Sequence, residues 1–199
     1  MKFYPKKKWG QNFLTDYNIA KKIVKILGDT SKSNVIEIGP GNGALTKIIN
    51  SKNIIGFEID SNLCRNLKND RIKNFTCINQ DILDVDLESY KFDKVIGNLP
   101  YYISSQIIFK LLKNDLWDVA VFMVQKELAD RIISNSGSKQ YGRISVMIQA
   151  CCDVKKEFNV SPNCFFPKPK ITSSILTFKK KEIQNFNFER LEKVVKKCF

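Results

Sequence analysis

Val35-Ile36-Glu37-Ile38-Gly39-Pro40-Gly41-Asn42-Gly43 is a short apolar run that ends in alternating glycines. Its length predicts a buried strand over residues 35–38, followed by a helix that begins at Gly43. Glycines at such a junction let the backbone pass close to a bound nucleotide or amino-acid group without interference from a Cβ atom. The spacing is GxGxG rather than the dinucleotide pattern GxGxxG, so this loop alone is weak evidence for any one ligand.

Apolar runs and helical patterns alternate along the first two thirds of the chain. A lead-in helix is predicted that is capped by Thr15 or Asp16 and stops at Gly28. Further strands are predicted over 54–59, 75–78, 94–97 and 119–124, and helices from Asn62, from Ser104 and over 126–133. This repeated strand–helix order predicts an α/β fold with a mostly parallel central sheet and helices on both faces.

The last third of the chain has a different pattern. After Tyr141-Gly142-Arg143, an apolar helix is predicted to about Cys152. Two strand candidates, over 154–160 and 171–178, flank a proline-rich stretch and predict an antiparallel edge joined by a stiff surface loop. Lys179-Lys180-Lys181 has the composition of a linker, and an amphipathic helix begins at Phe188. We therefore predict a main domain with an N-terminal arm over 1–180, and a linker and the start of a helical domain over 181–199.

Charge and composition narrow the function. The 199 residues include 33 Lys and Arg against 20 Asp and Glu, a net charge of +13, which suits a polyanionic partner such as nucleic acid. The abundance of Lys, Asn and Ile also fits an AT-rich genome, so charge alone leaves RNA binding open. The chain contains no histidine, which removes Ser-His and Cys-His nucleophilic pairs and the commonest zinc ligand.

The cysteines and the apolar runs bear on the compartment. The chain has six cysteines without a CxxC pair, no apolar run near the roughly 20 residues that span a bilayer, and no hydrophobic signal core at its amino terminus. We predict reduced, buried thiols in a soluble cytoplasmic protein. The cysteines are Cys64, Cys77, Cys151, Cys152, Cys164 and Cys198.

Asn98-Leu99-Pro100-Tyr101 follows a predicted strand and carries the strongest chemical signal. Methyl transfer to a planar amino group needs acceptors that grip its N–H bonds and aim its lone pair at the donor carbon. An Asn oxygen beside a backbone carbonyl supplies such acceptors, Pro100 stiffens the loop, and Tyr101 offers a ring for stacking. The tetrapeptide also fits a plain strand-ending turn. Together with the glycine loop, it favours an amine-methylating site.

Two carboxylates follow the intervening strands. Glu58 lies 19 residues beyond Gly39, where it can accept hydrogen bonds from both hydroxyls of a ribose, as the acidic residue of NAD enzymes does. Asp81 could accept from an adenine amino group while Ile82 packs on the ring, or it could be a solvated loop acid. Asn98 disfavours a dehydrogenase, because hydride transfer has no use for this tetrapeptide. Orientation and desolvation can supply most of the acceleration of methyl transfer, so the absence of His is tolerable.

Five motifs, in order along nearly the whole chain, resemble the ribosomal RNA adenine dimethylase family of the KsgA type. The motifs are Gly10-Gln11-Asn12-Phe13-Leu14, Glu37-Ile38-Gly39-Pro40-Gly41, Asn98-Leu99-Pro100-Tyr101, Tyr141-Gly142-Arg143-Ile144-Ser145-Val146-Met147 and Phe165-Phe166-Pro167-Lys168-Pro169-Lys170. The resemblance implies a Rossmann-like class I methyltransferase that uses S-adenosylmethionine and no metal. Its implied reaction places two methyl groups on N6 of each of two adjacent adenosines near the 3′ end of small-subunit (16S) rRNA, with a monomer acting on an immature 30S particle during ribosome biogenesis.

The same resemblance implies the site residues. The target adenine would lie between the rings of Tyr101 and Phe165, with Asn98 and the Leu99 carbonyl receiving its amino hydrogens and Pro100 shaping the loop. The alternative for Phe165 is ordinary core packing, although its Pro167 and Pro169 frame favours a displayed ring. The implied donor-binding residues are Asn12, Leu14, Gly39, Glu58, Asp81 and Asn98.

Two departures from the family pattern accompany this resemblance. Tyr102 stands where the family commonly has a smaller polar residue, which affects the shape of the target pocket. The family usually continues into a helical carboxy-terminal domain, and the sequence ends at Phe199, where that domain would begin. We therefore expect a truncated helical domain and impaired positioning of RNA.

Alternative functions remain open. They are a non-catalytic ribosome-assembly or RNA-binding factor, and a large-subunit rRNA adenine methylase of the macrolide-resistance type; the 141–147 motif favours the small-subunit branch by resemblance only. Phosphate contacts need charge more than residue identity, so basic residues are the RNA-facing candidates. They are Lys6, Lys7, Lys8, Arg143, Lys168, Lys170 and Lys179 to Lys181.

Overall fold

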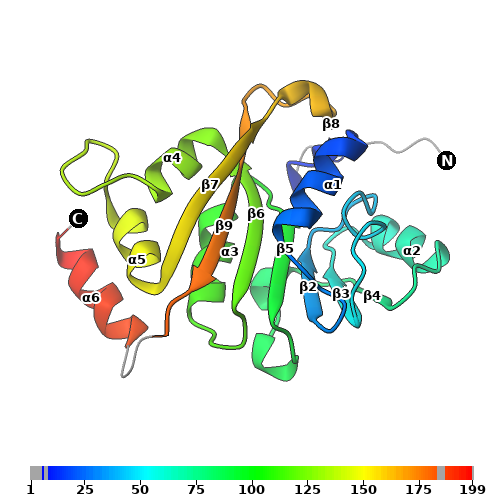
Figure 1. Cartoon of the computed structure of the whole chain (residues 1–199), viewed down its shortest axis with the longest axis horizontal. Coiled ribbons are helices and arrows are strands. Elements are labelled where there is room, and N and C mark those ends of the chain that lie inside the picture. Colours follow the sequence, from blue (N-terminus) through cyan, green and yellow to red (C-terminus); the bar gives the residue numbers. More distant parts are fainter. Residues whose placement is uncertain (1–5, 7–8, 183–186, 199) are drawn as a thin grey trace.

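The computed structural model describes residues 6, 9–182 and 187–198 and centres on one seven-stranded sheet (Figure 1). The strand order is β4-β3-β2-β5-β6-β9-β7. The first five are parallel, whereas β9 is antiparallel to both β6 and β7. This confirms the predicted α/β fold with an antiparallel edge. The strands are β2 (Asn34–Ile38), β3 (Asn53–Phe57), β4 (Phe75–Ile78), β5 (Lys94–Asn98), β6 (Val119–Gln125), β7 (Cys152–Val160) and β9 (Ser173–Lys180).

Helices pack on both faces of the sheet. α1 buries Ala20 and Ile23, and Leu27 just after it joins them in a core with residues of β2, β5, β6 and β9. α3, α4 and α5 contribute to a second core cluster (Figure 1). Asp16 caps α1 by accepting from the amides of Asn18 and Ile19, as predicted for that position. The helices are α1 (Tyr17–Ile26), α2 (Ser61–Asn69), α3 (Ser104–Leu112), α4 (Lys126–Ile132), α5 (Arg143–Cys151) and α6 (Phe188–Cys198).

The sheet reverses its strand order between β2 and β5. At such a point the connections leave in opposite directions, which opens a crevice at the carboxyl ends of the strands. The register pairs Ile38 with Gly97, so the glycine loop after β2 begins beside Asn98 at the end of β5. The ends of β3 and β4 reach the same edge. The fold therefore gathers the loops that follow four consecutive parallel strands.

The predicted helix from Gly43 is wrong. Residues 41–48 form successive turns, with the Lys47 amide bonded to the Gly43 carbonyl at 3.1 Å and the Ile49 amide to the Leu45 carbonyl at 3.2 Å. Gly43 has a φ of +79°, and a Cβ atom there would lie 2.9 Å from the Leu67 side chain of α2. This left-handed residue interrupts regular helical geometry while allowing the loop to approach α2 closely.

A second, two-stranded sheet joins the N-terminal arm to the proline-rich stretch. β1 (Phe13–Leu14) is antiparallel to β8 (Phe165–Phe166), with Phe13 opposite Phe166. The amide and the hydroxyl of Thr15 both donate to the Cys164 carbonyl, at 2.8 and 3.0 Å. The sequence patterns did not indicate this pair, because two-residue strands have no measurable periodicity.

The linker prediction for Lys179-Lys180-Lys181 is also wrong. Lys179 and Lys180 end β9, and Lys180 forms an ion pair with Asp115 at 2.6 Å. Lys181 donates to the Gln149 carbonyl at 2.8 Å and pairs with Asp153. Lys180 and Lys181 therefore fasten the end of β9 to Asp115, which precedes β6, and to Asp153 of β7.

The remaining described features concern α6, the cysteines and membrane spans. α6 packs on α5, where Arg143 pairs with Glu192 at 2.8 Å. All six cysteines are free, but the prediction that all are buried is wrong for the exposed Cys198 and the half-buried Cys164. Within the ranges that the structure describes, no helix has both the length and the apolar character needed to span a bilayer.

Candidate active site

A cavity that opens to solvent lies at the carboxyl edge of the parallel strands. Three parts of the chain wall it: the arm over 9–13, the loops after β2, β3 and β4, and the segment that follows β5. Most of the residues predicted from the sequence lie on these walls. They are Asn12, Gly39, Glu58, Asp81, Asn98, Leu99, Pro100 and Tyr101.

Leu14 and Phe165 are the predicted site residues that do not line this cavity. Each is 4% exposed, and they face each other across the β1–β8 pair within the core that α1 covers. The expected displayed ring of Phe165 is therefore a buried one in this structure. Its neighbour Phe166 is 59% exposed, because alternate residues of a strand point to opposite sides.

The Asn98 side chain is held in one orientation. Its Nδ2 donates to the backbone carbonyl of Asn12 at 2.9 Å, which leaves its Oδ1 as an acceptor. The following backbone is also fastened: the Leu99 amide donates to the Met123 carbonyl at 3.1 Å, and the Ser104 hydroxyl to the Pro100 carbonyl at 2.9 Å. A rigid loop of this kind presents an acceptor at a defined position.

Tyr101 places a fixed aromatic ring in the wall of the cavity. Its hydroxyl lies 2.7 Å from the Ser173 hydroxyl of β9, which ties the loop after β5 to the antiparallel edge. Burial raises the pKa of Tyr101. The phenol is therefore neutral at physiological pH, and its ring is available for stacking rather than for charge stabilisation.

Glu58 is a buried carboxylate, and each of its oxygens accepts a hydrogen bond from a backbone amide. Its Oε2 accepts from the Gly41 amide and its Oε1 from the Asp60 amide, each at 2.9 Å. Burial raises the pKa of Glu58, and these two backbone hydrogen bonds oppose that effect. Each carboxylate oxygen has a second lone pair, so the group can still accept hydrogen bonds from a ligand in the cavity.

Gly41 brings the glycine loop against the arm. Its φ is +60°, and a Cβ atom there would lie 3.1 Å from the Phe13 ring. Any larger residue would be strained and would push Phe13 out of place. The loop and the arm therefore share one packed contact at the cavity.

Asp81 and Tyr102 lie at the same end of the cavity. Asp81 is not simply a solvated acid: it accepts from the Leu83 amide at 2.9 Å and caps a short 3-10 helix, Ile82–Asp84. Ile82 is 6% exposed and lines the cavity beside it. Tyr102 is 56% exposed, and a Cβ atom on Gly10 would lie 3.5 Å from its ring. Burial, and then the Asp81 charge, raise the pKa of Tyr102.

Sequence reasoning missed the role of Asp60, which caps α2 and anchors the arm. Its carboxylate accepts from Lys6 Nζ at 3.0 Å, from Gln11 Nε2 at 3.2 Å and from the Asn62 amide at 3.0 Å. Burial is the largest single effect and works to raise the pKa of Asp60. The hydrogen bonds from Lys6, Gln11 and the Asn62 amide, together with the Lys6 charge, outweigh it, so the pKa is lowered. An acidic residue before a helix predicts a cap, but nothing in its local sequence indicates a partner 49 residues away.

Glu37 in β2 is a buried acid with an unpaired oxygen. It is 1% exposed, and its Oε2 has no hydrogen-bond partner among the residues that the structure describes. Burial raises the pKa of Glu37 to about 7. The unfolded chain ionises this group near 4.5, so native stability is lost as the pH rises from 4.5 through 7.

We expect Glu37→Gln to remove this pH dependence. A pKa raised from 4.5 to about 7 corresponds to roughly 3 kcal/mol, so the variant should gain about that much unfolding free energy relative to the parent between pH 4.5 and pH 8. Urea unfolding at both pH values measures the difference. An unchanged difference between variant and parent across this range would contradict the buried-charge interpretation.

The polar and apolar groups that line the cavity fit a nucleoside that carries an amino-acid group. It offers a buried acceptor pair at Glu58, an acid beside an apolar side chain at Asp81 and Ile82, and a glycine loop whose Gly39 lacks a side chain between the loop and the Asn98 carbonyl. S-adenosylmethionine has a matching part for each of these groups: its ribose hydroxyls, its adenine ring and its methionine moiety. The fold and this cavity define a methyltransferase of the S-adenosylmethionine-dependent class.

Comparisons with known proteins narrow the class to a family. A crystal structure of a dimethyladenosine transferase from Plasmodium falciparum is 33% identical with a TM-score of 0.88, over 94% of this chain and 70% of that one. The 23S rRNA methyltransferase ErmE is 27% identical with a TM-score of 0.78, over 94% and 79%. The family model for ribosomal RNA adenine dimethylase matches residues 2–199. The chain belongs to this family.

Curated relatives cover the chain almost completely. The ribosomal RNA small subunit methyltransferase A of Malacoplasma penetrans is 47% identical over 204 residues, which is all of this chain and 75% of that protein. The protein of the same name from Mycoplasma mobile is 40% identical over 98% of this chain and 78% of its own length.

Proposed function

We propose that this protein is an rRNA adenine N6-dimethyltransferase that acts on two adjacent adenosines near the 3′ end of small-subunit (16S) rRNA. The observation that carries the proposal is the loop after β5, in which Asn98 is oriented by Asn12 with its Oδ1 left as an acceptor inside the cavity. Relatives named as small-subunit methyltransferases, 40–47% identical, support the small-subunit branch.

We assign the donor to the side of the cavity formed by the arm and the loops after β2, β3 and β4. Glu58 would accept from the ribose hydroxyls, Asp81 from the adenine amino group, and Gly39 and Asn12 would border the methionine moiety. When bound, S-adenosylmethionine supplies an electrophilic methyl group on a sulfonium. The role of Leu14 would be to hold β1 against β8, since its side chain lies in the core.

The target adenine would occupy the side next to Tyr101. The Asn98 oxygen and the Leu99 carbonyl would accept its amino hydrogens, and Pro100 would keep both acceptors in place. β8 does not line this cavity: Phe165 is buried in the core beside Leu14, and Phe166 is exposed. The amino group becomes acidic as its nitrogen gains the methyl group, so its proton can pass to solvent without a strong base, and desolvation by these walls favours the transfer.

The test of function is transfer of labelled methyl groups from S-adenosylmethionine to 30S subunits that lack dimethyladenosine, with the nucleoside identified by mass spectrometry. We expect N6,N6-dimethyladenosine at the adjacent small-subunit pair. Transfer to 50S subunits instead would assign the protein to the large-subunit type. Donor binding without transfer to either subunit would indicate a non-catalytic assembly factor.

We also propose that Asp60 holds the arm over the donor. Asp60→Ser keeps a residue that caps α2 but loses the bonds to Lys6 and Gln11, so we expect about a tenfold weaker affinity for S-adenosylhomocysteine with melting within a few degrees of the parent. Calorimetric titration measures the affinity. Asp16→Ser, which changes the cap of α1 outside the cavity, is the matched control. Equal changes of affinity in the two variants would show that Asp60 acts only as a helix cap.

Residues 181–199 are proposed to begin a further helical domain, as in the longer family members. The monomeric state, the cytoplasmic location and the 30S particle as partner are parts of the same proposal, since a small-subunit rRNA enzyme must meet the ribosome during assembly. Of the basic residues predicted to face RNA, Lys168 and Lys170 are exposed, whereas Lys6 and Arg143 form ion pairs. Lys7 and Lys8 lie outside the described residues.

A further inference from the structure

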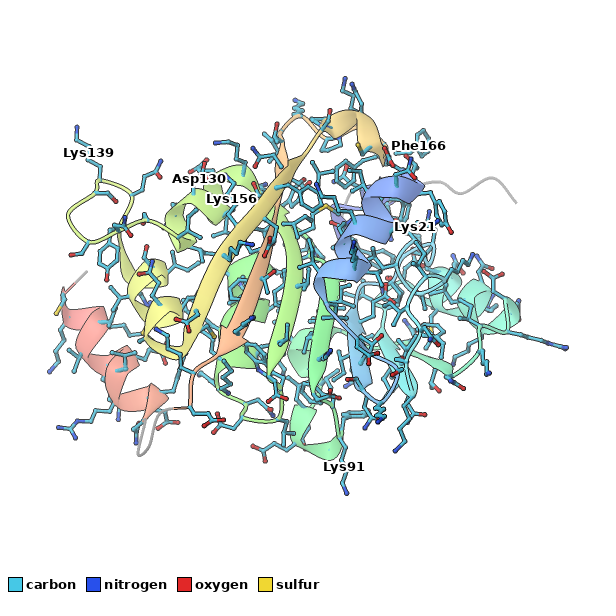
Figure 2. All side chains as sticks on the ribbon, viewed as in Figure 1. Lys21, Lys91, Asp130, Lys139, Lys156 and Phe166 are labelled. Carbon is cyan, nitrogen blue, oxygen red and sulfur yellow. The ribbon has the colours of Figure 1, made fainter. Side chains whose placement is uncertain are left out.

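Exposed aromatic side chains lie in the cavity wall and on α1 and β8, the two elements that adjoin the arm. Within the described part of the chain, three aromatic residues are more than half exposed: Tyr17, Tyr102 and Phe166. Tyr102 lines the cavity, while Tyr17 begins α1 and Phe166 ends β8. Figure 2 shows Phe166 and Lys21 of α1 on the same side of the molecule. We name this region the Tyr17–Phe166 surface; it comprises Tyr17, Lys21, Lys25, Phe166, Lys168 and Lys170.

Hydrogen bonds join this surface to the active site. Thr15, two residues before Tyr17, donates twice to the Cys164 carbonyl, two residues before Phe166. The β1–β8 pair continues this junction into the arm, whose Asn12 carbonyl holds Asn98. A ligand that spreads over the Tyr17–Phe166 surface would therefore pass directly to the mouth of the cavity.

The lysines of this surface are not neutralised. Among the described residues, Lys21, Lys25, Lys168 and Lys170 have no carboxylate within 4.0 Å. Elsewhere the pattern differs: Asp130 pairs with two lysines, one of them Lys156, at 2.6 Å each (Figure 2). The carboxylate nearest to Lys21 in sequence, Asp16, accepts from the first amides of α1, and the one nearest to Lys25, Asp29, accepts from the Ser31 amide.

The aromatic and cationic groups also contact each other. Lys21 Nζ lies over the Tyr17 ring, 4.5 Å from its centre, so the ammonium covers one face of the ring and a base would stack on the other face. Flat rings together with unpaired cations are the combination that binds single-stranded nucleic acid, in which bases stack on aromatic side chains and phosphates contact lysines. A duplex would not use exposed rings in this way, because the faces of its bases are already stacked on one another.

We propose that the Tyr17–Phe166 surface binds the single-stranded rRNA that flanks the target adenosine. This inference rests on the proposed function and identifies the part of the substrate that α1 and β8 contact. The amphipathic pattern of α1 explains its buried face but gives no role to the exposed Tyr17 and Lys21. The hydrogen bonds between Thr15 and Cys164 bring these two residues next to β8.

The test uses two substituted proteins and a charge-matched control. Lys21→Gln with Lys25→Gln removes two cations, Tyr17→Ala with Phe166→Ala removes both rings, and Lys91→Gln with Lys139→Gln removes two exposed lysines at distant places on the molecule (Figure 2). KM for 30S subunits that lack dimethyladenosine, affinity for a fluorescent 12-nucleotide single-stranded RNA at several salt concentrations, and affinity for S-adenosylhomocysteine are measured for each.

We expect the double-lysine and the double-aromatic variants to have a KM for 30S subunits at least about fivefold above that of the parent, with unchanged affinity for S-adenosylhomocysteine. The salt slope for the oligonucleotide should fall by about 1.4 in the double-lysine protein, because each phosphate contact to a single strand contributes about 0.7. A KM and a slope equal to those of the Lys91/Lys139 control would overturn the proposal. Failure of the unsubstituted protein to methylate 30S subunits would instead refute the proposed function.

Discussion

Asn98→Ala is expected to lower kcat for methyl transfer to 30S subunits by about 10²–10³-fold, the range found when one oriented polar group is removed from an active site. The alanine removes the Oδ1 acceptor that aims the amino group, and it also releases the Asn12 carbonyl from its bond to Nδ2. Affinity for S-adenosylhomocysteine should change by less than about threefold, because Glu58 and Asp81 remain in place.

Single-turnover transfer at saturating donor measures this effect directly. Asn163→Ala, an exposed asparagine outside the cavity, is the matched control and should retain full turnover. Leu99 is 1% exposed and anchored to β6, so the loop should keep its course in the Asn98 variant. Turnover within tenfold of the parent would contradict the proposal that Asn98 orients the target amino group.

The parts of the site that follow strands were predictable from the sequence. Gly39 and Glu58 directly follow β2 and β3, Asn98 ends β5, and Asp81 comes three residues after the end of β4. The parallel order of these strands places their ends at one edge of the sheet. The local pattern was sufficient because strand direction alone determines where such residues meet.

The arm and β8 were not predictable in the same way. Phe165 and Phe166 are identical residue types, and their opposite exposure depends on which one faces Leu14 across the β1–β8 pair. Asp60 gains its two arm partners only through tertiary contacts with Lys6 and Gln11. Interactions between residues far apart in the sequence leave no periodic signal, so a sequence pattern cannot assign them.

The largest expected effect on donor binding belongs to Glu58→Gln. The amide keeps the size of the side chain but replaces one acceptor oxygen with a donor, which would face either the Gly41 or the Asp60 amide and disturb the glycine loop. We expect about a hundredfold weaker affinity for S-adenosylhomocysteine, since two ribose hydrogen bonds to a charged acceptor are lost or weakened. Global stability should not fall by a comparable amount, because a buried charge is removed at the same time.

The pH dependence of donor affinity gives this prediction its sharpest form. Burial raises the pKa of Glu58, so acidification protonates the carboxylate at a higher pH than in a free glutamate. The parent should therefore lose donor affinity as the pH falls through that raised pKa, whereas the Gln variant should bind weakly and equally across the range. Calorimetric titration of S-adenosylhomocysteine from pH 8 to pH 5 measures both curves. A parent curve that stays flat through the raised pKa would contradict a ribose held by the Glu58 carboxylate. A Gln variant that loses affinity in parallel with the parent would show that some other group titrates.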